Sequence, residues 1–119
     1  MKNLIYCPAE RAVYFLGGKW KIRILFSLFH NKKIRFGELK KGLKTITQQM
    51  LSKQLKELEA DGIVNREVIQ VMSPNVEYSL TEFGLSVMPI LKSFSEWSKR
   101  NTQTISVKLN KNFEENRIR

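Results

Sequence analysis

The sequence predicts a mainly α-helical domain that carries a small β-hairpin wing. Apolar residues recur three and four positions apart in several stretches, which is the spacing of amphipathic helices. Two β-rich runs, residues 63–71 and 75–80, flank the turn signal Met-Ser-Pro and so indicate a hairpin. The chain has 119 residues, of which 42% are hydrophobic, and this suffices for a single core.

Two helices are expected in the N-terminal third. Pro8 suits the first position of a helix, which makes Cys7 its N-cap, and Gly17 and Gly18 should end it. A second helix is expected over residues 19–29, where apolar residues stand at helical spacing before a polar stretch.

The next elements are a short extended piece, a brief helix, a tight link and a longer amphipathic helix, at residues 34–36, 37–43, 44–46 and 47–62. In the last of these, Leu51, Leu55 and Leu58 share one stripe that should face a core. Its opposite face carries glutamine, serine and lysine, and its acids come only in the last turns, although a helix normally favours acids in its first turn.

The hairpin follows this helix, and Thr81 should cap a long helix that runs to about Ser98. A short helix, a tight turn, a second helix and a hairpin together make a winged helix-turn-helix. We expect residues 1–100 to form this DNA-binding and dimerisation domain, with the N- and C-terminal helices forming a dimer interface. Residues 101–119 are expected to be a polar C-terminal tail, as a short helix, an added strand or a disordered segment.

Positive charge is concentrated in one third of the chain. Eleven basic residues and a single acid, Glu38, lie between Lys19 and Lys56, so this window carries a net charge of +10, equal to that of the whole chain. Such a field favours a polyanionic partner, nucleic acid before an anionic membrane. The alternatives are a merely solubilising surface or an acidic protein partner.

Composition excludes several classes of function. One cysteine and one histidine are too few for a metal site or for His-based catalysis, so we expect no metal, no cofactor and no enzyme activity. The chain shows neither an apolar run of membrane-spanning length nor a secretory signal, so a cytoplasmic protein without membrane contact is expected.

In a helix-turn-helix the second helix enters the major groove of DNA. Glutamine there can bond bidentately to adenine, and lysine can contact guanine or phosphate. We therefore expect phosphate contacts near the turn from Lys40, Lys41 and Lys44, and groove contacts from Thr47, Gln48, Gln49, Ser52, Lys53 and Lys56. The alternative is an ordinary surface helix.

The stretch from Cys7 to about Trp97 contains, in order, the motifs Cys-Pro, Gly-Gly-Lys-Trp, Arg-Phe-x-Glu-Leu, Leu-x-x-Leu-Glu-x-Asp-Gly and Val-Glu-Tyr-x-Leu-Thr-x-x-Gly, the last of which ends at Gly84. Together they resemble the HxlR-type winged-helix regulators of bacteria, relatives of the MarR group. The resemblance implies a homodimer on double-stranded DNA with an inverted-repeat operator. It also implies, for some members, sensing of an oxidant or small electrophile as inducer through the N-terminal cysteine.

The wing departs from the family pattern. The position before Val76, commonly basic in the family, is Asn75, and the turn contains no Lys or Arg. Any wing contact should therefore come from Asn75 or Ser73 through hydrogen bonds, with Arg66 as the nearest basic group.

The last long helix shows a coiled-coil spacing of four and three, which indicates a two-fold interface rather than packing within one subunit alone. The expected interface residues are Phe83, Val87, Ile90, Leu91, Phe94 and Trp97, with Leu4 and Tyr6 added from an N-terminal arm.

Cys7 is the one residue with plausible covalent chemistry. The helix N-terminus and Arg11, one turn along, both favour the thiolate, whereas Glu10 opposes it. Cys7 and Arg11 are thus the candidate thiol sensor, and the alternative is an inert buried cysteine.

Overall fold

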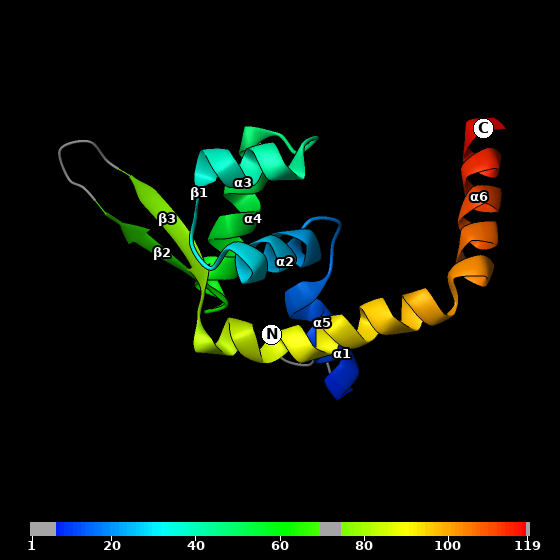
Figure 1. The fold of residues 1–119 in the computed structure, drawn as a ribbon, viewed down its shortest axis with the longest axis horizontal. Coiled ribbons are helices and arrows are strands. Elements are labelled where there is room, and N and C mark those ends of the chain that lie inside the picture. The colour runs from blue at the N-terminus through cyan, green and yellow to red at the C-terminus, as the bar shows by residue number, and fades with distance from the viewer. Residues whose placement is uncertain (1–6, 70–74, 119) are drawn as a thin grey trace. The chain divides into compact units, whose positions relative to one another are not determined.

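The computed structural model describes residues 7–69 and 75–118, with side chains as far as residue 111. Its elements in order are α1 (Pro8–Leu16), α2 (Lys21–Asn31), β1 (Ile34–Arg35), α3 (Phe36–Leu43), α4 (Gln48–Ala60), β2 (Val64–Val68), β3 (Val76–Leu80), α5 (Glu82–Arg100) and α6 (Thr102–Ile118). This order confirms the predicted winged helix-turn-helix, with α3 and α4 as the helix pair and β2 and β3 as the wing (Figure 1).

The chain divides into two compact units, residues 1–88 and 89–119. The first unit holds every element from α1 to β3 and the start of α5. The second holds the rest of α5 and α6.

The strands form one antiparallel sheet in the order β1-β3-β2. In the wing, Val64 is paired with Leu80 and Val68 with Val76. The short extended piece expected at residues 34–36 supplies β1, whose Ile34 pairs with Tyr78. The sheet therefore anchors the base of the wing to the segment that links α2 to α3.

The core lies between α2, α3, α4 and the base of the sheet. Leu51, Leu55 and Leu58 are all buried, so the predicted apolar stripe of α4 is confirmed. Ile24, Leu25, Leu28, Leu39, Ile46 and Ile63 are fully buried with them. Each such side chain contributes about 1.5–3 kcal/mol through burial, which fixes one face of α4 inward and turns the other outward.

Threonine hydroxyls cap two helices, and only the cap at Thr81 was predicted from the sequence. The Thr47 hydroxyl accepts a hydrogen bond from the backbone N–H of Met50 at 3.1 Å, at the start of α4. The Thr81 hydroxyl accepts from the N–H of Gly84 at 3.0 Å and donates to the carbonyl of Gly62 at 2.6 Å. The second cap therefore ties the start of α5 to the end of α4.

The C-terminal residues form a helix, one of the three alternatives that the sequence left open. Helix α5 runs two residues further than expected, to Arg100, and α6 follows from Thr102. Within the described ranges, no helix is both long and apolar enough to cross a membrane.

Candidate nucleic-acid interface

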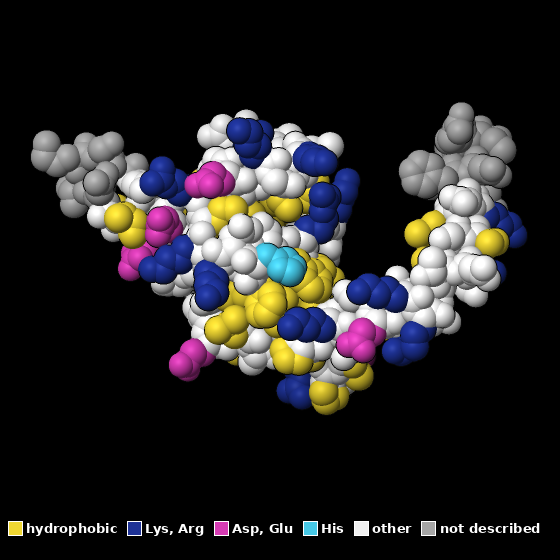
Figure 2. All heavy atoms as spheres, viewed as in Figure 1, with side chains coloured by type: hydrophobic (Ala, Val, Ile, Leu, Met, Phe, Trp, Pro, Cys, Tyr) yellow, Lys and Arg dark blue, Asp and Glu magenta, His cyan; other side chains and the backbone are white. Residues whose placement is uncertain are grey.

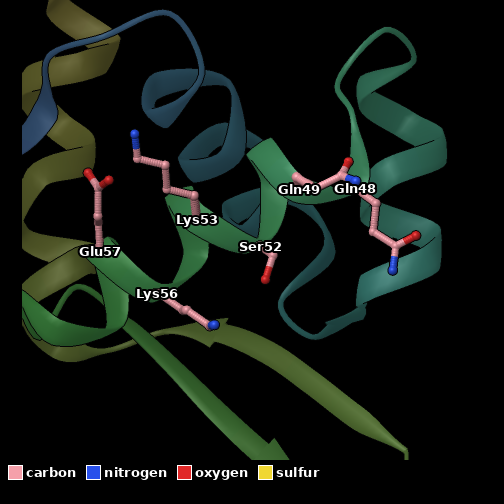
Figure 3. Close-up of a pocket in the computed structure, with 6 residues that line it drawn as sticks. All are labelled: Gln48, Gln49, Ser52, Lys53, Lys56 and Glu57. Atoms are coloured by element: carbon pink, nitrogen blue, oxygen red, sulfur yellow. The ribbon is translucent and has the colours of Figure 1, made fainter.

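The outward face of α4 is polar and open. Thr47, Gln48, Gln49, Lys53 and Lys56 are exposed, and Ser52 is partly so. An open hollow of about 640 Å³ runs along this face, lined by Gln48, Gln49, Ser52, Lys53, Lys56 and Glu57. Figure 3 shows these side chains following one another along the helix, with Gln48 towards α3 and Glu57 at the other end. Five of the six residues predicted for the groove thus line one continuous surface.

An ion pair closes the Glu57 end of the hollow. The Lys21 ammonium lies 2.9 Å from the Glu57 carboxylate, and the Lys21 side chain is only 9% exposed. The hydrogen bond and the charge of Lys21, aided by Lys53, hold the pKa of Glu57 below its ordinary value of 4.5 despite partial desolvation. Hence the one acid in the hollow has its charge largely compensated.

Sequence reasoning missed this pair because it counted Lys21 only as one of the eleven basic residues between Lys19 and Lys56. Lys21 is the one buried charged residue in the part of the chain that the structure describes. The available signal was its place between Trp20 and Ile22, at the start of an apolar helix, but nothing local identifies Glu57 as its partner.

The turn between α3 and α4 holds Lys44 in a strained backbone conformation. Its φ is 63° and its ψ −78°, and the Thr45 N–H donates to the Leu43 carbonyl at 2.9 Å. This is a γ-turn with positive φ, an uncommon conformation for a residue that carries a Cβ. Lys44 and Lys41 are exposed and Lys40 is partly exposed, so the three lysines predicted to hold phosphates gather around the helix-turn-helix turn. Figure 2 shows dark-blue side chains at this end of the first unit.

The wing carries acids that the sequence reasoning did not weigh. Glu67 and Glu77 face each other across β2 and β3, and Lys33 approaches Glu67 at 3.7 Å. Arg66 is exposed and Asn75 is partly exposed, whereas Ser73 lies outside the described residues. The wing therefore offers less positive charge than α4.

A sequence profile of the HxlR-like helix-turn-helix family matches residues 15–106. The chain belongs to this family. Among its relatives is the HTH-type transcriptional regulator YybR of Bacillus subtilis, 46% identical over 99 residues that cover 83% of this chain and 78% of YybR.

This HxlR-like chain is also similar to two solved structures. The redox regulator HypR in its reduced form is 44% identical, with a TM-score of 0.80, and the match covers 85% of this chain and 99% of HypR. A regulator assigned to the MarR family from Porphyromonas gingivalis is 33% identical, with a TM-score of 0.74, and the match covers 83% and 96% of the two chains. The family and its relatives are transcriptional regulators and not enzymes, so this chain is a transcriptional regulator of the HxlR/MarR type.

The predicted interface residues of this HxlR-like protein lie on α5 and near the N-terminus. In the first unit Phe83 is exposed and Val87 is partly so; in the second, Ile90, Phe94 and Trp97 are exposed, whereas Leu91 is buried within the single chain. Leu4 and Tyr6 lie outside the described residues. Exposed Val13 and Tyr14 on α1 were not predicted, although their place among apolar residues of a short helix could have indicated them.

Cys7 is exposed at the N-cap of α1, with extended backbone angles and a carbonyl that accepts from the N–H of Arg11. The thiol makes no capping hydrogen bond. The alternative of a buried cysteine is therefore wrong, and the thiol is accessible to reagents.

Proposed function

We propose that the protein binds double-stranded DNA as a homodimer and regulates transcription from an inverted-repeat operator. The observation that carries the proposal is the outward face of α4, which presents amide, hydroxyl and ammonium groups along one hollow while its single acid is paired to Lys21. A helix of this kind fits the major groove, where glutamine reads adenine and lysine reads guanine or phosphate.

The flanking elements supply the contacts that position α4 in the groove. Lys40, Lys41 and Lys44 would hold phosphates beside the turn, and Arg66 and Asn75 would contact the backbone from the wing. Because Glu67 and Glu77 sit on the wing strands, we expect the wing to contribute less affinity than the turn.

The exposed apolar residues of α5 support self-association. Large aromatic side chains favour the centres of interfaces, and Phe83, Phe94 and Trp97 are each more than half exposed in the single chain. A two-fold dimer would set two copies of α4 about 34 Å apart, one turn of DNA.

Salt dependence tests the DNA interface. The wild-type protein should bind a random-sequence duplex with an affinity that falls steeply with salt, because each phosphate contact releases counterions. Lys44→Ala should reduce the slope of log K against log[salt] by about 0.9, and because alanine keeps the Cβ, the strain of the turn should change little. A winged helix that serves only protein–protein contact would show no such binding, and that result would reject the proposal.

A second candidate function is thiol sensing, supported by the exposure of Cys7 and by the similarity to a regulator named for redox control. A quinone would add to the thiolate and form a C–S bond. Diamide would take two electrons and two protons from two thiols and leave a disulfide, either mixed or with Cys7 of the partner subunit. Either modification of Cys7 would change the orientation of the two subunits, and with it the relative position of the two copies of α4.

The thiol proposal is tested by comparing Cys7→Ser with the wild type. Diamide or a quinone should change the DNA affinity of the wild type and leave that of Cys7→Ser unchanged. Equal responses of the two proteins would reject the proposed thiol sensing and leave the proposed DNA binding unaffected.

A further inference from the structure

Two cations are held against one indole ring beside the helix-turn-helix. The Lys19 ammonium lies 5.0 Å from the centroid of the Trp20 ring, and the Arg23 guanidinium carbon lies 4.8 Å from it. Trp20 is 8% exposed and belongs to the core, whereas Lys19 and Arg23 are exposed. The ring attracts both cations and restricts their side chains to its surroundings, which are fixed because the ring is buried. Lys19 and Arg23 therefore lose less side-chain entropy when they contact a ligand.

Through Arg23, this cation pair adjoins the helix-turn-helix turn of the proposed DNA interface. An Arg23 guanidinium nitrogen donates to the carbonyl of Leu43 at 3.4 Å, and Leu43 is the last residue of α3, next to Lys44. Lys21, between the two cations in the chain, pairs with Glu57 in the α4 hollow. The start of α2 is thus tied to the turn at one point and to α4 at another.

Neither cation is neutralised. The sequence has no acidic residue between Glu10 and Glu38. Within the described residues, neither Lys19 nor Arg23 has a carboxylate within ion-pair distance, whereas Lys21 and Lys33 each have one. The guanidinium of Arg23 donates one N–H to the Leu43 carbonyl, and its other N–H groups can donate to phosphate oxygens.

We propose that Lys19 and Arg23, ordered by Trp20, form a second phosphate clamp that grips the DNA backbone beside the phosphates held near Lys44. The proposal rests on the proposed DNA binding and extends its contact surface to the start of α2. A clamp of this kind positions the protein without reading bases. It should therefore add equal affinity for every sequence.

The test measures binding to a fluorescent random-sequence duplex over a series of salt concentrations. Lys19→Gln should lower the slope of log K against log[salt] by about 0.9, and Lys19→Gln with Arg23→Gln by about 1.8. Arg23→Lys keeps the charge and should retain most of the wild-type slope. The control is Lys99→Gln with Arg100→Gln, two exposed cations at the end of α5, which should leave the slope unchanged.

The outcomes separate the two proposals. If the wild type binds the duplex and Lys19→Gln keeps its slope, the clamp is overturned and the proposed DNA binding stands. If the wild type binds polyglutamate but not the duplex, both are overturned. Since Lys19 makes no hydrogen bond among the described residues, its single variant carries the test even if the change at Arg23 disturbs the turn.

Discussion

Gln49 lies on the exposed face of α4 in its first turn, one helical turn before Lys53. If its amide bonds bidentately to an adenine, Gln49→Ala should lower the preference for operator over random DNA by about 1–3 kcal/mol. A competition gel shift measures this ratio. Gln103→Ala, an exposed glutamine on α6, is the matched control, and an unchanged ratio in Gln49→Ala would remove the base contact.

The ion pair of Glu57 with Lys21 should make the free energy of unfolding depend on pH. Lys21 lowers the pKa of this carboxyl from 4.5, so the pair stabilises the fold above the pKa of the unfolded chain, and the stabilisation is lost as pH falls through the lower, folded value. Chemical denaturation should show Glu57→Gln less stable than the wild type at neutral pH, with a gap that closes below about pH 4.5. The control is Glu59→Gln, an exposed acid on the same helix without an ion pair among the described residues. A gap that stays constant with pH would contradict the role of the pair.

Single-residue roles were predictable where a local pattern determines them. The exposed face of α4 follows from the spacing of its three leucines, and the N-cap at Thr47 follows from its residue type. The partners of Lys21 and Arg23 were not predictable, because each contact joins two residues that are at least twenty positions apart in the chain. Such pairs are decided by how the helices pack.

At the scale of elements, the junction between α4 and α5 depends on a glycine. A Cβ added at Gly84 would lie 2.3 Å from the Ile63 carbonyl oxygen, a backbone atom that cannot turn aside. Gly84→Ala should therefore destabilise the fold by about 1–3 kcal/mol through overpacking. Gly42→Ala on α3 is the control, since its Cβ would meet nothing within 4 Å and should stabilise the helix by about 0.5–1 kcal/mol. Denaturant titration compares the two, and equal effects would contradict the role of the contact.

Most elements were predictable from apolar spacing and capping residues, and two were not fully determined. The pairing of β1 with β3 needs a strand more than forty residues away, so Ile34 and Arg35 alone indicate only an extended piece. The helix α6 remained one of three alternatives because residues 101–119 lack a clear apolar stripe. Its apolar residues Ile105, Val107 and Leu109 stand two apart in the sequence, which is not the spacing of a helix.

At the scale of the whole molecule, the proposed function requires two copies of the chain. Trp97 is 58% exposed, and an aromatic residue at the centre of an interface commonly contributes at least about 2 kcal/mol to binding. Trp97→Lys should shift the protein from dimer to monomer in sedimentation experiments. Leu85→Lys is the matched control, because Leu85 is a similarly exposed apolar residue of α5 that lies off the predicted seam.

The same variant links assembly to DNA recognition. A dimer gains affinity on an inverted repeat because the second α4 binds at a high effective concentration once the first is bound. Trp97→Lys should therefore bind a full operator little better than a single half-site, while its affinity for the half-site stays near that of the wild type. If Trp97→Lys remains a dimer and keeps the full advantage of the inverted repeat, the seam of α5 is not the interface, and the two copies of α4 must be paired through another surface.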